Sequence, residues 1–427
     1  RLPGPYGLVR YGVAPDHPRI KQIMVALHKV LDRGAARFIG NVNYGSDLDL
    51  ADLHDLYDAV IFSTGCIRDA ELNIPGVDLP ESYGAADFVN WYDGHPDVGR
   101  TWPLAAREVA VIGAGNVALD VARMLSKHPE DLLPTDIPAN VYEGLKTNPV
   151  TDVHIFARRG PAQVKFSPLE LRELGQVPGV DVIVYPEDFD FDDGSEAAIR
   201  SSNQTKQVVK TLTDWTLKEP EDFTASRRVH LHFLHRPAEI LGDGKVTGLR
   251  TERTALNGDG TVSGTGEFHD WDVQAVYRAV GYFGSPLADL PFDEVAGVVP
   301  NVAGRVVTKD GAPVERVYTT GWIKRGPVGL IGSTKSDARE TIGNVIADSE
   351  SAGDGLRRAG SPDPQAVLDL LEERGVPYTN WDGWQRIDAH ELSLGEGEGR
   401  ERIKVVPREE LTAIALAKEL ARASTNP

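Results

Sequence analysis

The chain has 427 residues, of which 41% are hydrophobic and 26% charged, and this composition predicts a soluble globular protein of two or three domains. Its formal net charge of −19 argues against general nucleic-acid binding, which needs a basic surface. With Cys66 as the only cysteine and no apolar run of roughly 20 residues, a disulfide framework, a CxxC redox pair and a membrane span are excluded, and the cytoplasm is expected.

The first hundred residues alternate between helical and strand patterns. After a loop rich in proline and glycine (1–18), residues 21–33 carry apolar side chains at helical spacing, and 37–45 read as a strand and turn. A short helix over 50–57 leads into the apolar strand 58–65. This alternation is typical of a parallel sheet with helices on its faces.

The rest of the chain continues the alternation. The elements expected are a helix over 82–94, a strand from 107 with a helix to 128, a long loop over 129–150, a strand over 153–160, a helix over 168–175, a strand over 180–186, a surface helix over 205–217, a β-hairpin over 229–256, a strand over 271–282, a strand, glycine-rich loop and helix over 316–348, and one clear tail helix over 366–374.

The stretch AVIGAGNVALD combines a strand, a glycine turn and a helix start. Gly113 permits the tight turn, Gly115 lets the backbone approach a pyrophosphate, and Ala118 is small enough for close packing of helix on sheet. The N–H groups at the start of the helix can bind the anion. In this context the pattern predicts a dinucleotide site.

The end of the next strand indicates which dinucleotide. An NAD site usually has an acidic residue there, which binds the ribose 2′-hydroxyl. This chain has Arg158 and Arg159, whose planar donors suit a 2′-phosphate. We therefore expect NADP(H).

A second glycine-rich segment, GWIKRGPVGLIGSTKSDA, precedes a long helix. Trp322 follows Gly321, and further glycines recur at three-residue spacing. Backbone N–H groups at a helix N-terminus can stabilise the electron-rich end of a flavin, and Trp322 can form a wall of such a site. A purely structural glycine turn is the alternative.

These motifs resemble the adrenodoxin-reductase-type ferredoxin–NADP reductases, including their actinobacterial members. The stretches that carry the resemblance are GLVRYGVAPDHPRIK (7–21), FIGNV (38–42), VIGAGNVALDVAR, VHIFARRGPAQVKFSPLELREL, AVGYFGSPL (279–287) and GWIKRGPVGLIGSTKSDARETI. The resemblance covers nearly the whole chain in order. It implies an α/β fold in three layers with two Rossmann-like domains, FAD in one and NADPH in a second inserted into it, and electron transfer from NADPH through FAD to a ferredoxin, often for a cytochrome P450.

The resemblance also assigns site residues. The implied NADP contacts are Ala114, Gly115, Asn116, Val117, Arg158, Arg159 and Glu170. The implied flavin contacts are Leu8, Val42, Trp322, Gly329, Leu330 and Ile331. His17 and Glu173 match a pair that the family keeps near the junction of nicotinamide and flavin, where they position the ring or relay a proton. Glu170 and Glu173 lie three residues apart on a predicted helix, so both can face one cleft.

The domain limits expected from the resemblance are 1–103 and 316–427 for the FAD domain, and 104–315 for the NADP domain. The family opens with a strand, GxGxxG and a helix, and in this sequence GLVRYGVAPDHP already arrives at residue 7. We therefore expect that the first βαβ unit of the FAD domain is absent and that the chain is processed or fragmentary. We expect that the protein binds no metal ion and that it is a monomer.

Two other functions stay open at this point. A nucleotide-binding module without its own flavin chemistry would account for the absent βαβ unit. A protein like the small subunit of glutamate synthase has the same order of flavoprotein motifs, but normally carries a cysteine-rich iron–sulfur region. Disulfide reductases need a CxxC pair, which Cys66 alone does not supply.

Overall fold

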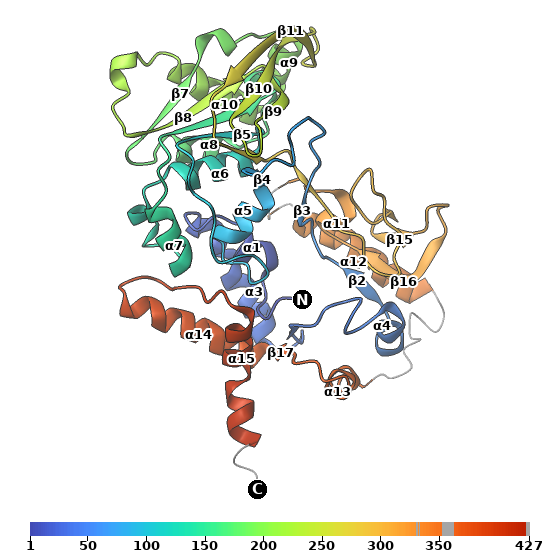
Figure 1. Cartoon of the computed structure of the whole chain (residues 1–427). Coiled ribbons are helices and arrows are strands. Elements are labelled where there is room, and N and C mark those ends of the chain that lie inside the picture. Colours follow the sequence, from blue (N-terminus) through green and yellow to red (C-terminus); the bar gives the residue numbers. More distant parts are fainter. Residues whose placement is uncertain (330–331, 333, 352–362, 424–427) are drawn as a thin grey trace.

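The structure is a computed structural model that describes residues 1–329, 332, 334–351 and 363–423. Two sheets with parallel strands organise it, one in the upper part of Figure 1 and one at the right, with the C-terminal helices below. Among the described helices, none combines the length and the apolar character needed to cross a bilayer.

The larger sheet has six strands, all parallel, in the order β4-β12-β5-β6-β8-β7. Its strands are β4 (Ser82–Gly84), β12 (Ala275–Arg278), β5 (Glu108–Ile112), β6 (Asp152–Ala157), β8 (Arg227–Phe233) and β7 (Val180–Val184). Residues Val109 to Ile112 of β5 are at most 2% exposed, as expected where a parallel sheet is covered on both faces.

Helices cover one face of this sheet. They are α5 (Ala85–Tyr92), α6 (Asn116–Ser126), α8 (Pro168–Leu174) and α10 (Asn203–Trp215), and their apolar sides form the main core with the strands. The other face packs against the antiparallel strands β9 (His235–Leu241), β10 (Gly248–Leu256) and β11 (Val262–Trp271), through contacts such as Phe156 with Leu249. The result is a three-layer α/β unit.

The second sheet has the order β14-β15-β16-β2. Its strands are β14 (Asn301–Val302), β15 (Arg305–Val307), β16 (Pro313–Thr319) and β2 (Val60–Phe62), of which β16 and β2 are parallel. Its core includes Phe62, Val317 and Ile323, and the helices around it are α4 (Leu50–Leu56), α11 (Trp322–Arg325) and α12 (Thr334–Ser351). β2 lies at the edge of the described sheet and joins residues of the N-terminal part to residues beyond 313.

Short elements connect the two sheets. β3 (Arg68–Asp69) pairs with β13 (Tyr282–Phe283), and β1 (Ile39–Gly40) pairs with β17 (Thr379–Asn380). The N-terminal helices are α1 (Gly7–Tyr11), α2 (Pro18–Lys21) and α3 (Ile23–Asp32). The C-terminal helices are α13 (Ala366–Glu373), α14 (Trp381–Gly397) and α15 (Arg408–Ala423).

Several element predictions were wrong or incomplete. The expected loop over 129–150 contains a 3₁₀ turn (Pro129–Leu132) and α7 (Ala139–Lys146), which forms because Val141 and Leu145 are buried. Only the turn GDGK and its flanks form the expected hairpin, β9–β10, whereas 227–233 belong to the parallel sheet. α9 (Asp193–Ser201) and β11 were not anticipated.

The tail contains two long helices beyond the predicted one. α14 continues through Gly383 and Gly395 and ends at Gly397, and α15 follows it. Tertiary packing outweighs the poor helix propensity of glycine here, because Trp384 and Ile387 are buried against Leu411 of α15.

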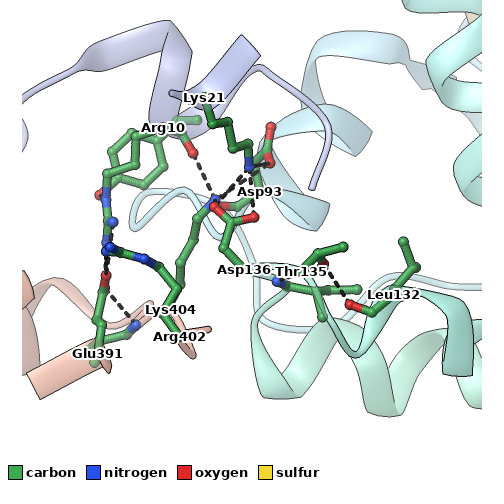
Figure 2. Close-up of polar contacts among 12 residues, drawn as sticks. Arg10, Lys21, Asp93, Leu132, Thr135, Asp136, Glu391, Arg402 and Lys404 are labelled. Atoms are coloured by element: carbon green, nitrogen blue, oxygen red, sulfur yellow. Dashed lines mark hydrogen bonds and ion pairs between the residues drawn. The ribbon is translucent and has the colours of Figure 1, made fainter. Parts of the chain in front are cut away.

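Buried ion pairs fasten this tail to the rest of the chain (Figure 2). Arg10 of α1 donates to both carboxylate oxygens of Glu391 on α14, at 3.0 and 2.5 Å, and both side chains are at most 3% exposed. Lys404 lies 3.1 Å from Asp136, which also accepts from Lys21 at 2.7 Å.

Asp93 completes this cluster at 3.6 Å from Lys404 and 3.7 Å from Lys21. Its carboxylate oxygens are buried without a hydrogen-bond partner among the described residues. Burial therefore raises the pKa of Asp93 to about 7, although both lysines act in the opposite direction.

Candidate nucleotide-binding and reaction site

The glycine turn lies between β5 and α6, where the sequence pattern places it. Gly113 has φ +145°, and a Cβ atom there would lie 2.2 Å from the carbonyl oxygen of Ala279. Glycine is therefore required for the close approach of this turn to the strand end after β12. Ala118 is fully buried in the core, which matches its predicted packing role.

Gly115 differs from Gly113 because its surroundings are open. A Cβ atom at Gly115 would have no heavy atom within 4 Å, and no side chain caps the 11-residue helix α6 that it precedes. Among the described residues, the N–H groups of Asn116 and Val117 have no acceptor. The helix N-terminus thus faces an empty space that an anion can enter.

Two contacts hold the turn against the segment before α8. The carbonyl oxygen of Ala114 accepts from the Lys165 N–H at 2.7 Å, and the Asn116 side chain accepts from the Ser167 N–H at 2.8 Å. The side chain of Asn116 therefore has a structural contact, whereas its backbone N–H is free for a ligand.

Arg158 and Arg159 follow β6, the strand beside β5 in the sheet. Within the described part of the chain, neither guanidinium makes an ion pair or a side-chain hydrogen bond. Only their backbone is held, since the Arg158 carbonyl accepts from Thr254 Oγ1 at 2.8 Å and the Arg159 carbonyl from the Leu234 N–H at 3.2 Å. Burial and the charge of Arg158 lower the pKa of Arg159, so an anion placed between the two would relieve a repulsion.

A buried cluster of charges surrounds His17, which directly precedes α2 and is 6% exposed. Its Nε2 lies 3.1 Å from Asp120 Oδ1 and 3.1 Å from Glu170 Oε2, and its Nδ1 lies 3.1 Å from Glu173 Oε2. Asp120 is on α6 and both glutamates are on α8, so the cluster joins the N-terminal segment to two helices of the six-stranded unit. Glu170 and Glu173 reach one side chain, in line with their spacing.

Arg123, also on α6, is the second cation of this cluster. Its Nη2 lies 2.6 Å from His17 Nε2 and 2.7 Å from Asp120 Oδ1, and its side chain pairs with Asp16. Sequence reasoning missed Asp16, Asp120 and Arg123. The available signal was a pair of charges three residues apart, Asp120 and Arg123, on a helix that is otherwise apolar.

The electrostatics of the cluster favour a charged His17. Burial and the neighbouring Arg123 oppose that charge, but the carboxylates of Asp120 and Glu170, which accept from the ring, outweigh them and raise the pKa of His17 to about 10. Burial also raises the pKa of Glu173, although His17 acts in the opposite direction. Burial therefore favours the protonated form of Glu173.

His17, Glu170 and Glu173 are a possible donor set for a metal ion, since one ligand atom from each lies within 4.8 Å of the others. Arg123 argues against that use, because its guanidinium is 2.6 Å from His17 and 3.6 Å from Glu170. A divalent cation at this place would be repelled by a buried positive charge. The geometry fits a proton-carrying cluster better than a metal site.

Trp322 begins α11 after Gly321, which has φ +75°. Its ring packs 6.3 Å from Tyr282 with near-parallel planes, and its carbonyl oxygen accepts from the thiol of Cys66 at 3.5 Å. Asp337 of α12 holds the turn by accepting from Thr320 Oγ1 and from the Gly321 N–H. The turn that carries Trp322 is thus held through its backbone, and the Trp322 ring stacks on Tyr282.

The other implied flavin residues are dispersed. Gly329 has φ +82°, while Leu330 and Ile331 lie outside the described residues. Leu8 is 40% exposed on α1. Val42 packs beside the buried Leu371, and its neighbours Asn41 and Asn43 line a polar cavity of about 620 Å³.

Comparisons with known proteins extend this description. No protein-family model matches the chain. The NADPH-ferredoxin reductase FprA of Mycobacterium tuberculosis is 42% identical over 423 residues, which cover 97% of this chain and 91% of FprA. The mitochondrial NADPH:adrenodoxin oxidoreductase of Arabidopsis thaliana is 37% identical over 431 residues, covering 97% and 89%. The structure of Mycobacterium tuberculosis FprA in complex with NADPH superposes with a TM-score of 0.89 at 41% identity, covering 97% of this chain and 91% of that one.

Proposed function

The chain belongs to the family of NADPH-ferredoxin and NADPH-adrenodoxin reductases, and from this membership and the site geometry we infer that it is an NADPH:ferredoxin oxidoreductase that uses FAD. Its fold is the α/β fold of that family, with Rossmann-like units. The observation that carries the proposal is the open N-terminus of α6 beside two arginines that have no protein partner in the described chain.

NADPH fits this arrangement at two points. The free N–H groups of Asn116 and Val117 suit the pyrophosphate, and the absence of a Cβ at Gly115 leaves room for it. Arg158 and Arg159 suit the 2′-phosphate, because each offers planar donors that no carboxylate of the described chain occupies. An NAD site would need an acidic residue there instead.

FAD fits the region around Trp322. Gly321 and Gly329 adopt positive φ. The surroundings of Gly321 are open, so its backbone is accessible to a flat ligand, and Trp322 supplies an aromatic wall. Bound FAD would accept two electrons from NADPH and release them singly, which an iron–sulfur partner requires. The predicted limits of the FAD domain (1–103 and 316–427) and of the NADP domain (104–315) belong to this proposal.

The roles of the protein's own residues follow from their placement. Trp322 and Tyr282 form a flat aromatic wall that excludes water from one side of the site. His17 keeps a positive charge close to the N-terminus of α6, and Glu173 is placed at 3.1 Å from its Nδ1 to take or return a proton. The protein thus contributes positioning and charge rather than covalent chemistry.

The proposed macromolecular partner is a ferredoxin. A protein with a net charge of −19 needs a local basic face to attract an acidic partner. A monomeric state and a cytoplasmic location complete the proposal.

The test is reduction of cytochrome c by the FAD-supplied chain, with and without a ferredoxin. We expect NADPH to support a rate that depends on ferredoxin concentration, and NADH to support a much lower one. A rate independent of ferredoxin would contradict the partner assignment. NADPH binding without any electron transfer would instead leave a nucleotide-binding module that lacks flavin chemistry.

A further inference from the structure

Asp16 and Arg123 form a buried pair next to His17. Arg123 donates to the two carboxylate oxygens of Asp16 from Nε at 2.8 Å and from Nη2 at 3.0 Å, and it is 1% exposed. Lys127, which directly follows α6, donates to the same carboxylate at 3.0 Å. Asp16 thus ties the loop before α2 to a cation on α6 and to one at its C-terminal end.

The Nη2 atom of Arg123 links Asp16 to the groups around His17. Arg123 Nη2 meets Asp16, His17 Nε2 and Asp120 Oδ1 at 3.0, 2.6 and 2.7 Å. The other terminal nitrogen, Nη1, is buried without a hydrogen-bond partner in the described chain and lies 3.6 Å from Glu170. A planar guanidinium clamped on one edge by Asp16 therefore has its remaining donors directed at the groups around His17.

Asp16 and Arg123 both contribute to the net charge of the groups around His17. The charged groups that face His17 from its own loop, from α6 and from α8 are Asp16, Asp120, Arg123, Lys127, Glu170 and Glu173. With His17 protonated there are four carboxylates against three cations, so one added proton makes the cluster neutral. Asp16 and Arg123 contribute one charge of each sign to this balance.

We propose that Asp16 and Arg123 are positioning residues for the reaction: Asp16 orients the Arg123 guanidinium, which donates to Asp120 and so keeps in place the Asp120 oxygen that accepts from the protonated His17 ring. The inference deepens the proposed function and rests on it for the role of His17. The pair acts through His17 and Asp120 rather than on substrate. Lys127 assists by neutralising Asp16 from the opposite side.

The first test measures the proton on His17 itself. In D16N, the cluster loses one negative charge while Arg123 and Lys127 remain, so the charged imidazole is less favoured. Nitrogen-15 NMR of histidine-labelled protein, with the His17 signal assigned from H17Q, should show titration at a pH about one unit below that of wild type.

The matched control for D16N is E391Q. Glu391 also accepts from a buried arginine, Arg10, at both oxygens, but belongs to the tail cluster. E391Q should lower the unfolding temperature and leave the titration of His17 unchanged. An unchanged His17 titration in folded D16N, as in E391Q, would overturn the proposal. Because this readout needs neither NADPH nor ferredoxin, it is independent of whether the proposed function is correct.

R123K provides a second test if D16N does not fold. Lysine keeps the charge but cannot contact Asp16, His17 and Asp120 from one planar group. With FAD supplied and ferricyanide as acceptor, we expect kcat for NADPH to fall about tenfold and KM to change less than about twofold. R10K, which breaks the other buried pair, should retain wild-type kcat per folded molecule. A kcat for R123K equal to that of R10K would show that the Arg123 contacts are only structural and would overturn the proposal.

Discussion

Replacing Arg158 and Arg159 by alanine should convert the chain from an NADPH enzyme to one that barely distinguishes NADPH from NADH. Hydrogen bonds to charged groups contribute about 1.5–3 kcal/mol each. The pair is partly exposed, so we take the lower figure for each arginine, or about 3 kcal/mol together. At about 1.4 kcal/mol per factor of ten, the KM for NADPH should rise about 100-fold while that for NADH stays nearly constant.

The stability of this double variant should hardly change. Neither guanidinium has a partner among the described residues, so the double variant loses no ion pair or hydrogen bond of these side chains. We expect a free energy of unfolding within about 0.5 kcal/mol of wild type. R200A/K210A, which removes two exposed charges from α9 and α10, is the control for net charge and should keep the preference. An unchanged ratio of kcat/KM for NADPH and NADH in R158A/R159A would refute the assignment of the 2′-phosphate.

Three further predictions concern the turn and the buried charges. G113A should lose about 2 kcal/mol of stability or more in a melting experiment, because its Cβ would lie 2.2 Å from the Ala279 carbonyl and φ is +145°. G115A should unfold like wild type in the same experiment. Its KM for NADPH should rise about tenfold, because a methyl group would occupy the approach of the pyrophosphate. The reverse pattern would contradict the roles given to the two glycines. The pKa of His17 is raised from 6.5 to about 10, so the stability that its charge adds is complete below about pH 6.5 and is lost as the pH rises towards 10. The free energies of unfolding of wild type and H17Q in urea should therefore differ most at low pH. A difference that does not change with pH would argue against a charged His17 ring. The pKa of Asp93 is raised from 3.8 to about 7, so the folded chain holds a proton that the unfolded chain has lost and stability falls as the pH rises through this window; D93N should lack that fall, and equal pH curves would contradict it.

The nucleotide turn was the part of the site that sequence could predict best. Gly113, Gly115 and Ala118 are close in sequence, and the chemistry of each depends on the strand before it and the helix after it. The structure adds why the two glycines differ, since only Gly113 is in close contact with the backbone at Ala279. That contact comes from a strand end 166 positions away (279 − 113), which local spacing cannot reveal.

The surroundings of His17 were less predictable for the same reason. The spacing of Glu170 and Glu173 places both on one side of α8, but helical periodicity does not indicate what packs across from it. Asp120 and Arg123 are more than a hundred residues from His17 in the chain. The tail shows a different limit, because α14 forms although it contains three glycines, with Trp384 and Ile387 buried against Leu411 of α15.

The central claim is that this chain transfers electrons from NADPH through a bound flavin. The most direct measurement is the visible absorbance of FAD during anaerobic mixing of the FAD-supplied chain with NADPH or with NADH. We predict that FAD stays with the protein on gel filtration and that its absorbance is lost rapidly with NADPH and slowly with NADH. A chain that binds NADPH but retains no FAD, or whose flavin absorbance persists in the presence of NADPH, would show that it does not transfer electrons from NADPH through a bound flavin.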